Sequence, residues 1–235
     1  MTLDLIGYAV LTAAVLINAF VFVTALPVSP AVRVALVAAA GVWTGLQLAL
    51  YAAGAFQAEI TRQAPLVGVM VAAPLIVTAI AAAASPGVRA ALLAVPSHVL
   101  IGLNIMRVFG GFFVMLAVVE RLSGPFPYFA GFGDVITGLI AIPLAMRAAQ
   151  GNAAPGSVLA WNTLGALDLI NAVTLGTLSS NGFAFQIFTG GAGSAAVQHM
   201  PWLLIPAVLV PFYLITHGII YAQLRQARRV AVSAA

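Results

Sequence analysis

Three charged residues stand where the sequence is most apolar. Arg107 lies near the centre of the stretch Ser97–Leu122, and Asp134 and Asp168 lie in the next two apolar stretches. At about 1.5 Å of rise per residue, Arg107 and Asp168 fall within roughly 2–3 Å of their midpoints, and Asp134 about 6 Å toward the outer side. A guanidinium keeps its proton and needs a partner in hydrocarbon. We therefore expect Arg107 to pair with Asp168, with Asp134 as the next candidate.

One guanidinium facing two carboxyls leaves one carboxyl without a counter-charge. Because an unpaired buried carboxylate is costly, we expect that group to hold a proton for much of the time. Such a carboxyl near the membrane midplane is what proton coupling or cation binding requires. Arg107 is alternatively expected to hold an anionic ligand. A purely structural role is a further interpretation, because an Arg–Asp pair between helices can simply set their register.

Amide and imidazole groups accompany these charges. Asn104 precedes Arg107 by three residues and Asn171 follows Asp168 by three, so each is expected to share its neighbour's helix face. His217 is expected about 7–8 Å toward the inner side, where it could relay protons. The predicted ligand- or proton-binding residues are Arg107, Asp168, Asp134, Asn104, Asn171, Asn162 and His217.

A redox function is the second interpretation. His98 and His217 are the histidines that could face each other across a b-type haem, or at a quinone site. Their expected depths differ by roughly 8 Å, so the two histidines could reach one haem only if the helices were tilted. We expect no bound cofactor and no metal site, because the chain has neither Cys nor an HExxH motif. The absence of Lys excludes a retinal Schiff base.

Seven apolar stretches are long enough to carry these residues across a bilayer, which takes about 20 residues each. The chain is 63% hydrophobic and 6% charged, whereas soluble proteins carry about 25% charged residues. We therefore predict one all-α transmembrane domain over residues 1–235. Residues 86–96 are too short to span, and predict either an interfacial helical turn or the kinked lower part of the fourth span. The predicted spans are Leu5–Leu26, Arg33–Gly54, Pro65–Ala84, Ser97–Leu122, Tyr128–Ala148, Gly156–Leu178 and Pro201–Gln223.

The arginine distribution predicts the orientation. With the C-terminus inside, six arginines lie on the inner face and two on the outer face, as the positive-inside rule requires. We expect a multi-pass bacterial inner-membrane protein, N-terminus out and C-terminus in. Its partners would be the lipid bilayer and a small molecule or proton, with no nucleic acid because the arginines are scattered. The inner arginines are Arg33, Arg89, Arg147, Arg225, Arg228 and Arg229; the outer ones are Arg62 and Arg121, with the acids Asp4, Glu59 and Glu120.

Small residues predict where the helices approach one another. Gly131, Asp134, Gly138 and Ala141 share one face of the fifth span, which we expect to pack closely against the fourth. Similar proline positions in the third and seventh spans suggest two parallel three-span repeats around a central span, a 3+1+3 arrangement. The loop 179–200 is predicted to be either an aromatic belt segment or a lid across the bundle.

The leading functional hypothesis is a small proton-coupled carrier or a ligand-binding membrane protein. The alternatives are a haem- or quinone-binding redox subunit and a non-catalytic structural or assembly protein. No motif in the sequence identifies an enzyme.

Overall fold

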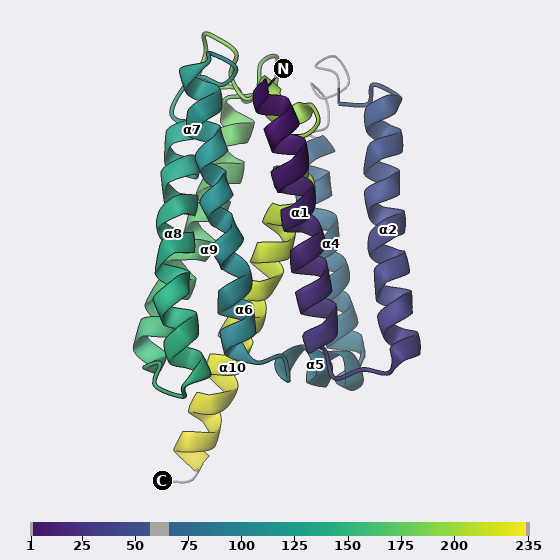
Figure 1. Ribbon diagram of the computed structural model, residues 1–235, viewed down its shortest axis with the longest axis vertical. Coiled ribbons are helices and arrows are strands. Elements are labelled where there is room, and N and C mark those ends of the chain that lie inside the picture. Colours follow the sequence, from purple (N-terminus) through teal and green to yellow (C-terminus); the bar gives the residue numbers. More distant parts are fainter. Residues whose placement is uncertain (1, 57–65, 234–235) are drawn as a thin grey trace.

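The computed structural model describes residues 2–56 and 66–233, and these ranges contain helices and turns but no strand. Seven helices are long and apolar enough to span a membrane, which confirms the predicted all-helical architecture. The chain termini lie at opposite ends of the bundle (Figure 1). We refer to these as the N-terminal end and the C-terminal end. Pro65, Arg62 and Glu59 lie outside the described residues.

The first part of the chain forms three long helices and one short one. Proline at the first position starts α2 and α5, where its missing N–H costs nothing. The side chains of Ser29 and Ser85 cap these two helices by accepting from the backbone N–H of Val32 and Val88. Residues 86–93 thus form a separate helix rather than the lower part of the fourth span, and its place at the membrane interface stays a prediction. The helices are α1 (Thr2–Ala25), α2 (Pro30–Ala52), α4 (Leu66–Ala84) and α5 (Pro86–Leu93).

The fourth predicted span changes its winding twice. It begins as α6 (Ser97–Leu103), tightens into the 3₁₀ segment η1 (Asn104–Gly110) and resumes as α7 (Gly111–Val118). A 3₁₀ stretch of this length inside a spanning helix is uncommon and often marks a functional hinge. The span ends at Val118 rather than at the predicted Leu122.

The remaining helices complete the bundle. The seventh span opens with a π-helical segment, a form that is frequent at functional sites. It also continues as helix beyond the predicted end at Gln223. These elements are α8 (Phe126–Ala149), α9 (Pro155–Leu178), η2 (Ala195–Gln198), η3 (Ile205–Leu209) and α10 (Val210–Ser233).

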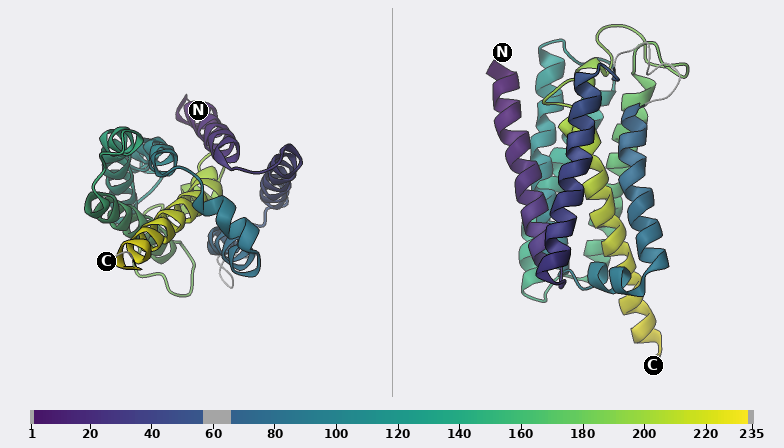
Figure 2. Two further views of the ribbon diagram at one scale, coloured as in Figure 1. Left: turned by 90° about the horizontal axis from the view of Figure 1, so that it is seen from below. Right: turned by 90° about the vertical axis from the view of Figure 1, so that its right-hand side faces the viewer.

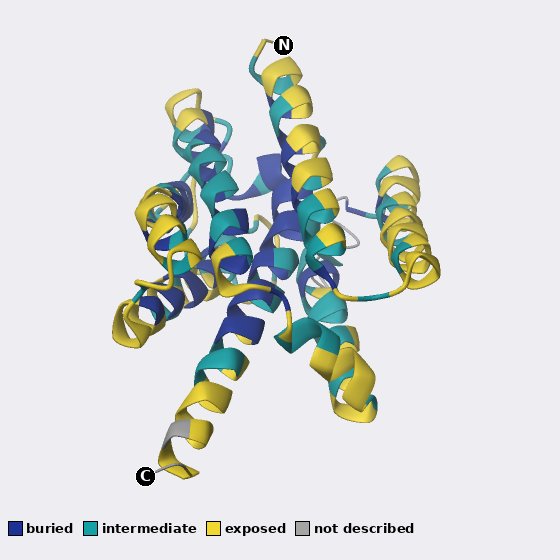
Figure 3. Ribbon diagram, turned by 60° about the horizontal axis from the view of Figure 1, so that its bottom comes forward, coloured by how far each residue is buried: buried dark blue, intermediate teal, exposed yellow. Residues whose placement is uncertain are grey.

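Helix α10 lies at the centre of the arrangement. Viewed from below, it crosses the bundle between α4 and α5 on one side and α8 and α9 on the other (Figure 2). Its middle turns are buried, whereas α2 is exposed along most of its length (Figure 3). In α2 the buried residue is Gln47, whose Nε2 donates to the carbonyl of Ala207 at 2.9 Å.

The small-residue face of α8 packs as predicted. Gly131, Asp134, Gly138 and Ala141 are all buried. A Cβ atom added at Gly138 would lie 2.8 Å from the backbone nitrogen of Val108 in η1. The backbones of α8 and η1 therefore approach closely, which brings the acid of α8 to the arginine of η1.

Candidate functional site

A buried guanidinium joins the acids of the fifth and sixth predicted spans. The side chain of Arg107 is 0% exposed; its Nε donates to Oδ1 of Asp134 at 2.7 Å and its Nη2 to Oδ2 of Asp168 at 2.6 Å. The side chains of the two acids are 8% and 10% exposed. The predicted pair with Asp168 is present, and Asp134 is a second partner rather than an alternative one.

The remaining guanidinium nitrogen connects α9 and α10. Nη1 of Arg107 lies 3.1 Å from the carbonyl oxygen of Gly165 and 3.1 Å from Nε2 of His217. All three nitrogens of Arg107 thus have protein partners, and four of its five N–H groups are used in hydrogen bonds within the protein. The long arginine side chain spans the depth difference expected between Arg107 and His217.

Hydrogen-bond logic determines the state of His217. A guanidinium only donates, so Nε2 of His217 must accept and its proton must sit on Nδ1. Nδ1 lies 2.8 Å from Oδ1 of Asn162, whose Nδ2 donates to the carbonyl of His217 at 3.1 Å. The imidazole is therefore neutral in this arrangement, and Asn162 belongs to the cluster as predicted.

The 3₁₀ winding of η1 places Asn104 beside the cluster. With three residues per turn, positions i and i+3 eclipse, so Asn104 and Arg107 share one face. Nδ2 of Asn104 donates to the carbonyl of Leu100 at 3.0 Å and to Oγ1 of Thr216 at 3.2 Å. Its Oδ1 is buried without a protein partner among the described residues.

Glycine at position 165 makes room for the centre of the cluster. A Cβ atom there would lie 2.7 Å from Cε1 and 2.8 Å from Nε2 of His217, and 2.9 Å from Nη1 of Arg107. These distances are too short for a real side chain. The contact between the imidazole and the guanidinium therefore requires glycine on the facing turn of α9.

Two further glycines accommodate the carboxylates. A Cβ atom at Gly110 would collide with the carboxylate of Asp134, and one at Gly133 would collide with that of Asp168. Glycine spacing in the sequence suggests close packing of α8, but nothing in it singles out Gly133 or Gly165 as the space for these side chains.

The first helix reaches the cluster through Tyr213. The Tyr213 ring lies 6.0 Å from the guanidinium carbon of Arg107, a cation–π distance. The hydroxyl of Tyr213 accepts from Nδ2 of Asn18 in α1 at 3.1 Å. One turn beyond His217, the hydroxyl of Tyr221 donates to Oγ1 of Thr163 at 2.8 Å.

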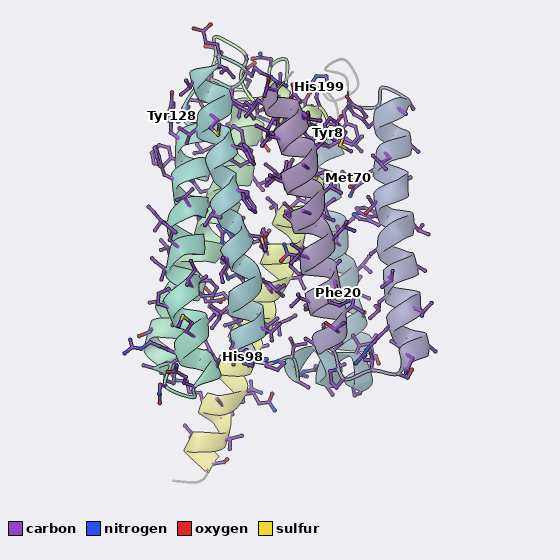
Figure 4. The ribbon with its side chains drawn as sticks, in the orientation of Figure 1. Tyr8, Phe20, Met70, His98, Tyr128 and His199 are labelled. Carbon is purple, nitrogen blue, oxygen red and sulfur yellow. The ribbon has the colours of Figure 1, made fainter. Side chains whose placement is uncertain are left out.

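Two predicted residues lie away from the cluster. Asn171 is exposed, because three residues along an α-helix leave it about 60° around from Asp168. His98 is exposed near the C-terminal end, as its label shows (Figure 4). The structure does not bring His98 and His217 together, and both ring nitrogens of His217 have other partners. Among the described residues no group of three or more His, Cys, Asp or Glu could hold a metal ion.

The charges of the cluster do not balance when both acids are ionised. Asp134 and Asp168 contribute two negative charges, Arg107 one positive charge and His217 none. One bound proton would bring the net charge of the cluster to zero. The arrangement is therefore suited to accept a proton at one carboxyl.

A cavity of about 70 Å³ reaches the cluster from the N-terminal end. Asp134 contributes to its lining, which is otherwise mainly apolar. Phe183, Ser194 and Gln198 of the loop 179–200 also line this cavity, which agrees with the lid interpretation of that loop. The cavity has room for a small number of water molecules.

A larger groove of about 1070 Å³ opens at the C-terminal end between α4, α5 and α10. Its lining includes Gly218 and Tyr221, which lie next to His217 and one turn beyond it. The cavity at the N-terminal end thus reaches the cluster at Asp134, whereas the groove at the other end is lined by the opposite face of α10 and by no residue of the cluster.

Residues 64–225 match the model of a protein family described as Domain of unknown function (DUF8737). The chain belongs to this family. The DUF8737 region contains Arg107, Asp134, Asn162, Asp168 and His217, whereas α1 and α2 precede it. No curated protein and no solved structure is significantly similar to the chain.

Proposed function

We propose that this protein is a small proton-coupled carrier of a bacterial inner membrane, with its N-terminus outside and its C-terminus in the cytoplasm. The proposal depends on one observation: a single guanidinium lies between two carboxylates, that of Asp134 buried and that of Asp168 partly buried. A net negative charge in hydrocarbon is costly, and binding a proton removes it. Asp134 and Asp168 would carry the coupling proton, and Arg107 would hold both in place.

The two hollows support a carrier more than a closed bundle. The cavity at the N-terminal end leads to Asp134 and has room for water beside that carboxylate. At the other end, the groove reaches Tyr221, whose hydroxyl donates to Thr163 of α9 one turn from His217. The non-α segments η1 and η3 lie in the two spans that carry Arg107 and His217, and such segments are frequent where helices bend during function.

The charge distribution supports the proposed orientation. In the part of the chain that the structure describes, the loops and helix termini at the C-terminal end carry most of the exposed arginines, while Arg121 lies at the N-terminal end with Asp4. The positive-inside rule places the arginine-rich end in the cytoplasm. The arginines at the C-terminal end are Arg33, Arg89, Arg147, Arg225, Arg228 and Arg229.

Proton flux in liposomes tests the proposal. Purified protein would be reconstituted around a trapped pH-sensitive dye, and flux would be driven by a potassium diffusion potential. We expect flux in the wild type, a large loss in Asp134→Asn and Asp168→Asn, and little change in Asp4→Asn. Asp4 is the matched acid because it pairs with Arg121, away from the cluster. Equal flux in all four proteins would refute coupling through these carboxyls.

A structural role is the second candidate, and one observation favours it: each nitrogen of Arg107 already has a protein partner. Such a cluster holds η1, α8, α9 and α10 in one register without any ligand. The two candidates differ in flux, since a purely structural cluster predicts none above that of empty liposomes.

A further inference from the structure

The groove at the C-terminal end carries a concentration of positive charge that the proposed carrier site does not use. Arg89, Arg225 and Arg229 line it, and all three are exposed. None of the described residues that line the groove is acidic. The ion pairs among the described residues belong to Arg107 and Arg121, so these three guanidiniums face the groove without a carboxylate.

The basic groove continues into an apolar one. A second hollow of about 430 Å³ lies along the seam between α4 and α10 and shares Ala82, Arg89 and Gly218 with the first. Its lining runs up to Leu75 on α4 and Leu214 on α10. The seam is open at Gly218, since a Cβ atom there would meet nothing within 4 Å.

Hydrogen bonds from α10 hold the wall of the groove in place. Nε2 of Gln223 donates to the carbonyl of Leu93 at 3.1 Å and to that of Val95 at 2.7 Å. These carbonyls belong to the end of α5 and the turn that follows it. The short helix carrying Arg89 is therefore fixed against the helix carrying Arg225 and Arg229, so the groove is already formed.

The dimensions of the two hollows match those of a lipid. The seam from Leu214 to Arg229 covers about 22 Å of helix. Half of a bilayer, headgroups included, measures about 20–22 Å. The basic half of the seam lies at the end of the bundle, where lipid headgroups would be. The apolar half of the seam lies toward the middle of the bundle. The cationic surface would thus face the anionic headgroup of a phospholipid, and the apolar surface would face its acyl chain.

We propose that this groove binds an anionic phospholipid. The phosphate would lie among the guanidiniums of Arg89, Arg225 and Arg229, which suit phosphate oxygens as donors. One acyl chain would follow the seam between α4 and α10. Basic pockets between membrane helices bind anionic headgroups on the cytoplasmic side. Assignment to the inner leaflet rests on the proposed orientation, whereas the site itself does not depend on the carrier function.

Spin-labelled lipids test this proposal in protein-containing phosphatidylcholine nanodiscs. The measurement is the immobilised fraction of spin-labelled phosphatidylglycerol compared with that of spin-labelled phosphatidylcholine. We expect the wild type to prefer phosphatidylglycerol, and each arginine removed in Arg225→Gln/Arg229→Gln to lower the preference about fivefold. The matched control is Arg147→Gln/Arg228→Gln, which removes the same charge from exposed residues at the same end but outside the groove lining.

A second variant tests the apolar half without changing charge. Gly218→Leu/Ala222→Leu fills the seam, and we expect it to lower the immobilised fraction of phosphatidylglycerol several-fold while all three arginines remain. Circular dichroism would check that each variant is folded. The proposal is overturned if the wild type shows no preference, if the control pair lowers it as much as the groove pair, or if excess inorganic phosphate displaces the lipid.

Discussion

Nη1 of Arg107 lies 3.1 Å from Nε2 of His217. Because the guanidinium has no acceptor, this contact leaves the imidazole one role, that of a neutral acceptor with its proton on Nδ1. The amide of Asn162 completes the arrangement, with Oδ1 at 2.8 Å from Nδ1. A ring that accepts a hydrogen bond from a cation and donates one to an amide orients the guanidinium toward both carboxylates.

The tautomer of His217 is therefore predicted. Nitrogen-15 NMR of protein labelled at histidine should show the proton of His217 on Nδ1 at neutral pH. His98 and His199 are exposed and serve as internal references. A proton on Nε2 would contradict the contact with Arg107, because two donors would then face each other.

Removal of the amide that accepts from His217 should destabilise the protein. Asn162→Leu leaves the buried Nδ1–H without a partner, which costs about 1–3 kcal/mol of unfolding free energy. Asn171→Leu makes the same chemical change on the same helix at an exposed position and should have little effect. Unfolding in mixed detergent micelles would measure both. Equal losses in the two variants would show that Asn162 contributes no particular hydrogen bond.

A single methyl group at position 165 should disturb the cluster without altering any polar side chain. Gly165→Ala places Cβ 2.7 Å from the ring of His217 and 2.9 Å from Nη1 of Arg107. We expect a loss of about 1–3 kcal/mol of unfolding free energy from overpacking, together with a loss of proton flux. Gly156→Ala lies on the same helix with nothing within 4 Å of its Cβ atom and is the control. Tolerance of both substitutions would mean that the close approach of α9 is not needed.

Removal of the charge of Arg107 alone should destabilise the protein more than removal of all three charges of the cluster. Arg107→Leu leaves the buried carboxylate of Asp134 and the partly buried one of Asp168 without their cation, and should cost about 3–5 kcal/mol of unfolding free energy. Combining it with Asp134→Leu and Asp168→Leu replaces the ion pairs by apolar packing and should recover most of that stability. The combined variant is informative for function as well, since a carrier would then be folded but inactive. If the triple variant were less stable than Arg107→Leu, the charge argument would be wrong.

Hydropathy alone predicted the framework of this molecule. Each of the seven predicted spans corresponds to a helical segment long and apolar enough to cross a membrane, with ends that differ by at most seven residues. Spanning segments are readable from sequence because hydrocarbon thickness sets their length and excludes charge from them. The same reasoning identified Arg107 and Asp168 as partners, since both lie near the midpoint of a span. The 3+1+3 repeat and the orientation in the membrane stay predictions.

Only the tertiary structure decided how the cluster is assembled, because sequence supplies depth along a helix but not the lateral distance between helices. Asp134 and His217 both reach Arg107 despite their different expected depths, since a long guanidinium side chain bridges them. Asn171 faces outward, although its spacing from Asp168 suggested a shared face. The roles of Gly133 and Gly165 exist only once α8 and α9 pack against their neighbours. Helix packing brings residues of different depths together in one site. This packing depends on contacts between residues far apart in the chain, which the sequence does not show.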